Sequence, residues 1–334
     1  MAMQLVCPAG NLPALQAAVD AGADAVYAGF RDQTNARAFP GLNFSDAELQ
    51  AGMRYARAKG AKVYLALNTY PDSVRLKQWH AAVDKAAELG ADAIIAAEMA
   101  VLDYAARTHP AMARHLSVQG SATTEPALRY AYERFGIVRA VLPRVLSIQQ
   151  VERLCERSPV AIEVFAFGSL CIMVEGRCQL SSYVTGASPN RHGVCSPAGF
   201  VRWDEFADGS RTARLNHVLI DRFQPAEPAG YPTVCKGRFD VGGEIFHALE
   251  EPTSLNTLEL IPRLARAGVV ALKIEGRQRG AAYVRAVART WREAIDRHAA
   301  APDRWEPRPQ WKQALSAHAE GHQTTLGPYH RSWH

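Results

Sequence analysis

The sequence predicts an α/β protein built as a (β/α)8 TIM-like barrel, a closed parallel sheet surrounded by helices. Short β-rich runs alternate with longer helical runs over residues 1–165, a pattern that gives parallel strands joined by helical crossovers. The segment AGADAV at residues 21–26 returns as LGADAI at residues 89–94, so a helix twice ends on glycine before a buried strand. Eight strand–helix units fit a barrel. A doubly wound open sheet is the alternative, but no glycine-rich phosphate loop follows the first strand.

The predicted strands are short apolar runs. In chain order they are residues 5–8, 24–28, 63–67, 93–97, 116–118, 140–142, 161–167 and 269–274. The helices between them carry start and stop signals: Ser45 with Glu48 and Ser147 with Gln150 have the spacing of capping boxes, and glycine closes several helix ends. The predicted helices are residues 12–21, 45–59, 74–89, 100–108, 125–135, 147–157 and 281–297.

The chain divides into a barrel domain and a tail. Residues 1–301 form the barrel, and residues 170–262 break the alternation as a cysteine-rich insertion between the seventh and eighth strands. Residues 302–334, rich in Pro, His, Gln and Gly, are expected to pack on the barrel as a C-terminal tail.

Composition limits the possible functions. The 334 residues are 48% hydrophobic with a formal net charge of +5, and no run of like charges concentrates that excess, so the charge gives no case for binding DNA. No segment approaches the ~20 apolar residues that span a bilayer, and no secretory signal opens the sequence. We therefore expect a cytoplasmic protein without an integral membrane segment, whose thiols stay reduced and whose clustered cysteines indicate metal binding or catalysis.

Four of the six cysteines, Cys171, Cys178, Cys195 and Cys235, fall in the insertion with the spacing Cys-x6-Cys-x16-Cys-x39-Cys. Four thiolates can saturate a tetrahedral zinc or the irons of a cubane cluster. The close Cys-x2-Cys pairs of common zinc modules are missing. We interpret the set as an iron–sulfur site built onto a folded domain. Four unrelated buried thiols, or His192 as a substitute ligand, are the alternatives.

Polar residues recur where the predicted strands end, which is where barrel enzymes place their active sites. These residues are Asn11, Asn68, Thr69, Glu98, Gln119, Arg144, Glu275 and Arg277. We expect about half of them to serve only as helix caps or loop contacts.

Roles follow from the side chains. Asn68, Gln119 and Arg144 are the predicted substrate-binding residues, and Glu163, Glu275 and Arg277 are the predicted catalytic residues. Arg144 and Arg277 suit a carboxylate because a guanidinium offers paired donors in one plane; alternatively, Glu275 holds Arg277 in a salt bridge. Glu163 lies within a strand and is expected to point into the barrel, where it meets an arginine or acts as an acid or base.

Longer motifs identify a family. The chain reads EVFAFGSLC at residues 163–171, GRC at 176–178, CSP at 195–197 and KIEGR at 273–277. These motifs resemble the peptidase U32 family, also called collagenase-like peptidases, and the likeness runs from CPAGN at 7–11 to TTLG at 324–327. The segments NAR at 35–37, VLPRVLS at 141–147 and EEPTSLN at 250–256 are most similar to the UbiU branch, which acts in oxygen-independent ubiquinone biosynthesis.

The resemblance implies a cofactor, a reaction and a partner. Cys171, Cys178, Cys195 and Cys235 would ligate one [4Fe–4S] cluster in the iron–sulfur subunit of an oxygen-independent hydroxylase. The substrate would be the ring of a ubiquinone precursor, prephenate the oxygen donor, and a second U32 protein of the UbiV type the heterodimer partner. A lipid-carrier protein is expected to deliver the apolar precursor.

Three other functions stay open. Related family members hydroxylate RNA bases, so an RNA-base hydroxylase is the alternative. A protease is less favoured, because the sequence has neither a His-Glu-x-x-His helix nor a Gly-x-Ser-x-Gly elbow. A non-catalytic subunit with a structural cluster is the last.

Overall fold

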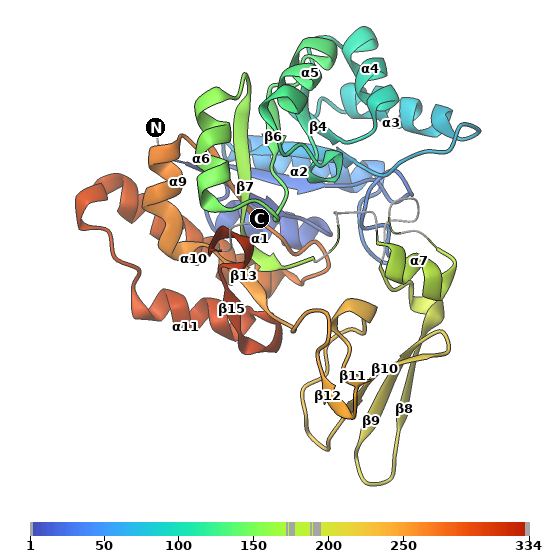
Figure 1. Cartoon of the computed structure of the whole chain (residues 1–334). Helices are drawn as coiled ribbons and strands as arrows, with labels where there is room; N and C mark the ends of the chain where they lie inside the picture. Colours follow the sequence, from blue (N-terminus) through green and yellow to red (C-terminus); the bar gives the residue numbers. More distant parts are fainter. Residues whose placement is uncertain (1–2, 172, 174–177, 188, 190–194, 331–334) are drawn as a thin grey trace.

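Eight parallel strands close into a barrel, as predicted (Figure 1). The computed structural model describes residues 3–171, 173, 178–187, 189 and 195–330. Consecutive strands pair with one another, and β14 pairs with both β7 and β1, which closes the sheet. The strands are β1 (Gln4–Pro8), β2 (Ala25–Ala28), β3 (Lys62–Leu67), β4 (Ala93–Ala96), β5 (Ala113–Leu116), β6 (Arg139–Val141), β7 (Ala161–Ser169) and β14 (Ala271–Ile274).

Helices cover the outside of the barrel because each buries an apolar stripe against the strands. Trp79 and Trp291 are fully buried in this layer, and the capping boxes of Ser45 and Ser147 both form. The helices are α1 (Leu12–Asp20), α2 (Asp46–Ala58), α3 (Leu76–Glu88), α4 (Met99–Thr108), α5 (Glu125–Phe135), α6 (Ile148–Arg157), α9 (Ile261–Ala267) and α10 (Ala281–Ala300).

The internal repeat has a structural role at the amino-terminal ends of the strands. Asp24 precedes β2 and its Oδ2 accepts a hydrogen bond from the backbone N–H of Leu5 at 2.7 Å. Asp92 precedes β4 and accepts in the same way from the backbone N–H of Val63 at 2.8 Å. Each aspartate therefore fastens the start of its strand to the neighbouring strand. This end of a barrel serves stability.

The fifth strand lies a few residues before its predicted position. Its predicted position was residues 116–118, but β5 is Ala113–Leu116, and residues 118–120 form a 3-10 helix. The error arose because Arg114 and His115 make the strand look polar. Arg114 donates to backbone carbonyls, including those of Met112 at 2.7 Å and Phe135 at 2.8 Å. His115 packs edge-on against the Tyr64 ring, with centroids 4.7 Å apart.

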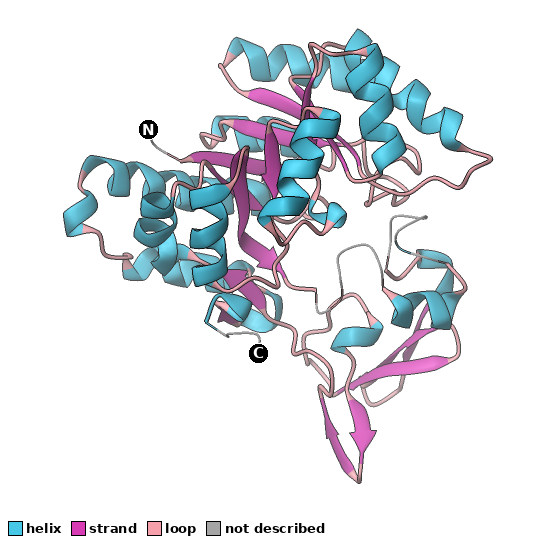
Figure 2. Cartoon of the chain, turned by 45° about the horizontal axis from the view of Figure 1, so that its top comes forward, coloured by secondary structure: helices cyan, strands magenta, loops and turns pink. Residues whose placement is uncertain are grey.

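The segment after β7 forms a small unit with its own core (Figure 2). Val184, Leu215 and Ile220 are buried together there. Its elements are α7 (Gln179–Thr185), an antiparallel sheet of β8 (Val201–Glu205), β9 (Arg211–Leu215) and β10 (Val218–Phe223), and a hairpin of β11 (Phe239–Val241) and β12 (Glu244–Phe246). The chain then returns to the barrel through β13 (Ser254–Asn256), which pairs antiparallel with β7.

The C-terminal segment lies against the barrel. Helix α11 (Pro309–His318) buries Trp311, whose Nε1 donates to Glu293 of α10 at 3.1 Å. Strand β15 (Thr324–Thr325) pairs parallel with β13, and the Tyr329 side chain is buried. Among the helices described, none has both the length and the apolar character needed to cross a bilayer.

Candidate functional site at the barrel mouth

A cavity of about 950 Å³ lies at the carboxyl ends of the barrel strands. This size is typical of small-molecule sites, which run to about 1,000 Å³. Barrel residues form an apolar wall, the segment after β7 supplies another wall, and residues 319–322 of the tail reach it. The apolar barrel residues are Tyr27, Ala66, Ile95, Val141 and Phe165.

The four clustered cysteines all line this cavity. Cys171 follows β7, and Cys178 is the N-cap of α7, where its Sγ accepts from the backbone N–H of Ser181 at 3.4 Å. The carbonyl of Cys195 accepts from the hydroxyl of that serine. Cys235 lies in a short 3-10 helix. The fold thus brings together four thiols that are far apart in sequence. His192 lies outside the described residues.

Burial disfavours the thiolate form of Cys195 and Cys235. Burial raises the pKa of Cys195 to about 11, with further contributions from the Cys171 and Cys178 thiolates. Burial raises the pKa of Cys235 to about 12, and Cys171 and Cys195 add to it. Arg37 opposes the shift at Cys195 and Lys236 opposes it at Cys235.

The four thiols are not drawn together around one point. No three His, Cys, Asp or Glu side chains in the described ranges gather closely enough to hold a single metal ion. A mononuclear zinc would require all four sulfurs at about 2.3 Å from the same ion. A cubane cluster is larger, because each thiolate binds a different iron. Four thiols beside cationic side chains are a donor set that suits an iron–sulfur cluster.

Some of the residues at the strand ends cap helices, and others line the cavity. Asn11 and Glu98 are helix caps: Asn11 accepts from Ala14 N–H at 2.9 Å, and Glu98 from Ala100 N–H at 2.6 Å. Five others line the cavity: Asn68, Gln119, Arg144, Glu275 and Arg277.

Arg277 is seated without a carboxylate partner among the described residues. Its Nη1 donates to Asn35 Oδ1 at 3.0 Å and lies 3.5 Å from Asn43 Oδ1. Gly29 makes room for it, since a Cβ there would lie 2.8 Å from that nitrogen. Burial lowers the pKa of Arg277 to about 10, so the group keeps its charge at neutral pH. Glu275 pairs instead with Arg37 at 3.4 Å, so the alternative of a Glu275–Arg277 salt bridge is not what the described structure shows.

Gln119 and Ser196 present unsatisfied polar atoms to the cavity. Gln119 is 5% exposed and Ser196 is 2% exposed, yet Gln119 Oε1 and Ser196 Oγ find no hydrogen-bond partner within the described structure. Buried polar atoms nearly always have a partner. Because both residues line the cavity, water or a bound molecule there can supply these hydrogen bonds.

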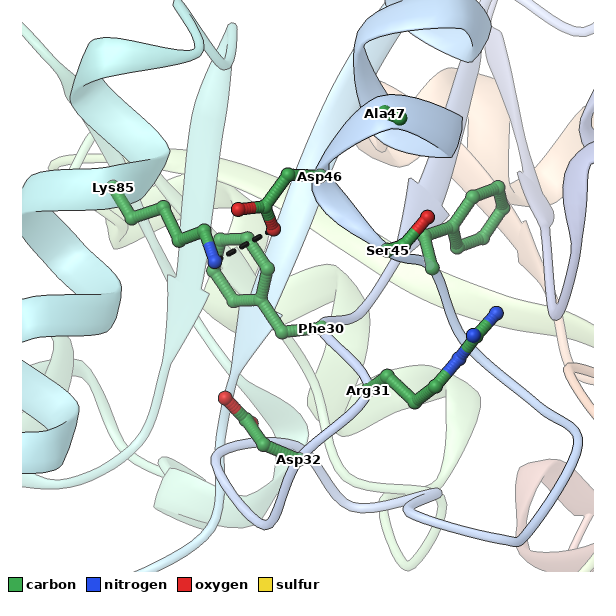
Figure 3. Close-up of a pocket in the computed structure, with 8 residues that line it drawn as sticks. Phe30, Arg31, Asp32, Ser45, Asp46, Ala47 and Lys85 are labelled. Atoms are coloured by element: carbon green, nitrogen blue, oxygen red, sulfur yellow. Dashed lines mark ion pairs between the residues drawn. The ribbon is translucent and has the colours of Figure 1, made fainter.

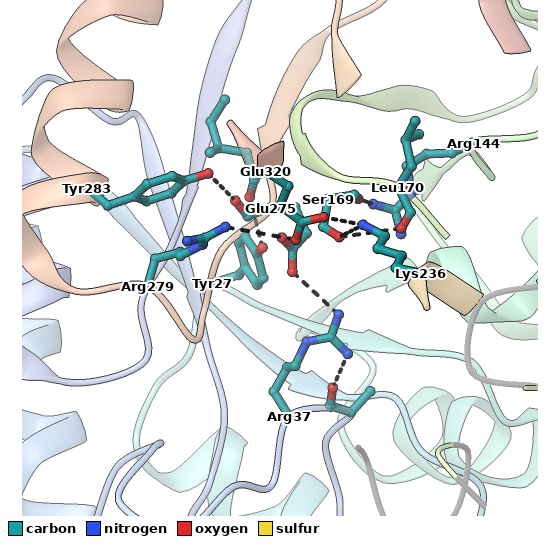
Figure 4. A network of polar contacts seen from close by, with 12 residues as sticks. Tyr27, Arg37, Arg144, Ser169, Leu170, Lys236, Glu275, Arg279, Tyr283 and Glu320 are labelled. Carbon is teal, nitrogen blue, oxygen red and sulfur yellow. Dashed lines mark hydrogen bonds and ion pairs between the residues drawn. The ribbon is translucent and has the colours of Figure 1, made fainter. Parts of the chain in front are cut away.

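A polar network joins the barrel, the inserted segment and the tail at the cavity mouth (Figure 4). Lys236 Nζ donates to Ser169 Oγ at 3.1 Å and pairs with Glu320 of the tail. Arg144 donates to the carbonyl of Ser169, and its guanidinium lies 4.5 Å from the Phe165 ring centroid. The network holds the walls of the cavity in fixed relation.

Glu163 lies beneath the cavity rather than on its wall. Its carboxylate is 1% exposed and pairs with Lys273 Nζ at 2.7 Å and Arg139 Nη1 at 3.1 Å. Burial opposes its ionisation, but the two cations outweigh that effect and lower its pKa. The expectation that it meets an arginine is confirmed. Lys273 itself lines the cavity and was not among the predicted site residues.

Arg37 was also missed, although the segment that contains it was singled out. Asn35 accepts from Arg277, the N–H of Ala36 donates to Asn68 Oδ1 at 3.0 Å, and Arg37 pairs with Glu275. Residues 35–37 thus contact three predicted site residues in succession. They lie in an irregular loop, where no periodicity reveals which way a side chain points.

A second hollow of about 480 Å³ lies outside the barrel, between the start of α2 and helix α3 (Figure 3). Lys85 pairs there with Asp46 at 2.6 Å and lies over the Phe30 ring. Arg31 pairs with Glu48 at 2.8 Å. These charges are balanced within the wall, unlike those of the cavity at the barrel mouth.

The fold and the site define a (β/α)8 barrel whose mouth is covered by a cysteine-bearing insertion. The family model described as Peptidase family U32 matches residues 10–331. The chain belongs to this family.

Curated relatives agree with the family assignment. The tRNA hydroxylation protein P of Escherichia coli (strain K12) is 31% identical over 321 residues, covering 89% of this chain and 68% of that protein. The tRNA hydroxylation protein P1 of Bacillus subtilis (strain 168) is 30% identical, covering 93% and 67%. A collagenase of Porphyromonas gingivalis is 32% identical, covering 88% and 65%. The chain thus spans about two-thirds of the length of these relatives.

Among solved structures, the U32 peptidase Mk0906 covers 82% of this chain and 93% of its own, with 12% identity and a TM-score of 0.49.

Proposed function

We propose that this chain is the iron–sulfur subunit of an oxygen-independent hydroxylase that acts on the ring of a ubiquinone precursor, together with a UbiV-like second U32 protein. The observation that carries the proposal is the single cavity that four cysteines share with Gln119, Arg144 and Arg277. Metal ligands and groups suited to a small anionic molecule face the same space.

The cofactor of this proposal is a [4Fe–4S] cluster held by Cys171, Cys178, Cys195 and Cys235. Arg37 and Lys236 lie close enough to lower the pKa of two of these thiols, so they favour the thiolate form that binds metal. When bound, such a cluster supplies one-electron transfer. The chain contributes a partly enclosed cavity in which a substrate can meet it.

The oxygen donor of this proposal is a dicarboxylate such as prephenate. Arg277 and Arg144 both line the cavity, and among the described residues the Arg277 guanidinium donates to two amide oxygens and forms no ion pair with a carboxylate. A charged group in such a site favours an anionic ligand, and a guanidinium binds a carboxylate through two parallel hydrogen bonds. The two arginines would bind and orient the donor, while the apolar wall that includes Ile95 and Phe165 accepts a ring.

The segments that resemble the UbiU branch support the choice of substrate. Residues 35–37 hold Arg277, Asn68 and Glu275, residues 141–147 include Arg144, and residues 250–256 bring Pro252 to the cavity. Residues of all three segments therefore line the cavity that we propose binds the substrate.

The test is anaerobic ubiquinone synthesis in cells that depend on this chain. Arg277→Ala should lower the ubiquinone content at least tenfold, because a hydrogen bond to a charged group contributes about 1.5–3 kcal/mol. The matched control is Arg263→Ala, which removes a surface arginine paired with Glu152 and should leave synthesis unchanged. Normal synthesis in the Arg277 variant, at normal protein levels, would end the donor-binding role.

A second candidate function is hydroxylation of an RNA base, because several relatives are named as RNA-hydroxylating proteins. One of them, the 23S rRNA 5-hydroxycytidine C2501 synthase of Escherichia coli (strain K12), is 28% identical to this chain, covering 88% of this chain and 39% of that protein. The sheet β8–β10 also places Arg202, Arg214 and Arg222 on one face. Filter binding of tRNA at low and moderate salt distinguishes the two, because phosphate contacts give steep salt dependence. Tight, salt-sensitive binding would favour RNA over the quinone precursor.

A further inference from the structure

Lys273 is a buried amine on the floor of the cavity. It lies on β14, where residues 271 and 273 point toward the barrel interior. Its side chain is 6% exposed, yet it lines the cavity. Of the seven lysines in the sequence, Lys236 and Lys273 line this cavity, and Lys236 is held by Glu320 and Ser169 at the mouth.

The surroundings of Lys273 contain more positive than negative charge. Glu163 is shared by Lys273 and Arg139, so one carboxylate faces two cations. Arg277 adds a third, because both Lys273 Nζ and the Arg277 guanidinium lie over the Tyr27 ring, at 4.0 and 5.9 Å from its centroid. An uncharged amine at residue 273 would leave Glu163 paired with Arg139 alone, which balances the charge.

Two physical effects favour the neutral form of the Lys273 amine. Burial lowers the pKa of Lys273, and the charges of Arg139 and Arg277 act in the same direction against Glu163. A desolvated lysine beside other cations is the arrangement in which enzymes use lysine as a nucleophile toward carbonyl groups. The proton that the ammonium releases leaves through the cavity that Lys273 lines, while Glu163 stays ionised and paired with Arg139.

We propose that Lys273 forms an imine with a 2-oxo acid whose carboxylate is bound by Arg277, an inference that rests on the proposed donor site. The amine nitrogen adds to the ketone carbon to give a carbinolamine. This intermediate then loses its hydroxyl group, together with a proton, as one water molecule. No oxidant or reductant is consumed. The imine fixes the former ketone carbon at residue 273 while Arg277 binds the carboxylate, so the 2-oxo acid is oriented in the cavity.

The test is reductive trapping with pyruvate. The whole protein is incubated with pyruvate and sodium cyanoborohydride, and its intact mass and peptide masses are compared with those of a sample lacking pyruvate. The expected result is one reduced pyruvate adduct per chain, carried by the peptide that contains Lys273. An adduct spread over several lysines, an adduct on Lys236, or no adduct would overturn the proposal. This readout uses the wild-type chain and does not depend on how any variant folds.

Two variants sharpen the assignment. Lys273→Arg keeps the positive charge near Glu163 but has no nucleophilic amine, so the adduct should be lost. Lys85→Arg, at the outer hollow, should trap as much pyruvate as the wild type. Arg277→Ala should reduce trapping at low pyruvate and recover at high pyruvate, because carboxylate binding precedes imine formation. Trapping needs no cluster, partner or quinone precursor, so it can succeed where the proposed hydroxylation fails.

Discussion

Replacing Glu163 by glutamine tests whether its carboxylate stabilises the folded barrel by pairing with the buried cations Lys273 and Arg139. The variant keeps the shape of the side chain but leaves Lys273 and Arg139 without their carboxylate, and these side chains are 6% and 12% exposed. Breaking a buried ion pair by removing one partner costs about 3–5 kcal/mol. At about 2 °C for each kcal/mol in a chain of this size, the Tm should fall by roughly 6–10 °C.

The assay is urea and thermal unfolding of Glu163→Gln beside a matched control. Glu152→Gln removes the carboxylate from a pair with Arg263 whose side chains are 29% and 38% exposed, and surface pairs contribute about 0–1 kcal/mol. Adding Lys273→Met to Glu163→Gln should recover part of the loss, because it removes one stranded cation. If Glu163→Gln costs no more free energy of unfolding than Glu152→Gln, the buried network does not carry the charges assigned to it.

Three further predictions follow. Burial lowers the pKa of His115 to about 3; below the ordinary value of about 6.5 the unfolded chain binds a proton that the folded chain does not. From pH 7 to pH 5 the free energy of unfolding should therefore fall by about 2 kcal/mol more in the wild type than in His115→Phe, as measured by urea titration. The control is His217→Ala, which removes an exposed histidine and should show the same pH dependence as the wild type. Gln119→Leu should leave the Tm unchanged or raise it, because the variant lacks the unsatisfied acceptor Oε1. The same variant should lower anaerobic ubiquinone synthesis about tenfold. A lower Tm with normal synthesis would contradict the ligand-binding role of Gln119. Asp92→Ala should cost about 1–3 kcal/mol in urea unfolding, since the buried N–H of Val63 loses its partner, and an unchanged midpoint would remove the structural role of the repeat.

The barrel could be predicted because its signals are local. Strands that are buried on both faces appear in the sequence as apolar runs. Capping residues mark where helices begin, and glycines mark where they end. The position of β5 could not be predicted in this way, because Arg114 and His115 occupy strand positions. Arg114 is tolerated because backbone carbonyls surround its guanidinium, and these contacts depend on the folded structure.

The site could be predicted in part because barrel geometry gathers the ends of its strands. This rule found Asn68, Gln119 and Arg277, which all line the cavity. It missed Lys273, which lies inside a strand where structural and functional residues look alike, and Arg37, whose loop has no repeating pattern. Four cysteines that are far apart in the sequence line one cavity. The chain between Cys195 and Cys235 first forms the strands β8, β9 and β10, and the spacing of the cysteines does not specify this path.

Iron and sulfide analysis of the anaerobically purified chain tests the central proposal most directly, with Cys171→Ala and Cys155→Ala prepared in parallel. Cys155 lies on α6 and is not among the residues that line the cavity, so it serves as the matched control. The account predicts about four irons and four sulfides per chain in the wild type and in Cys155→Ala, and a marked depletion in Cys171→Ala. One zinc without sulfide, or metal that survives in Cys171→Ala, would contradict it.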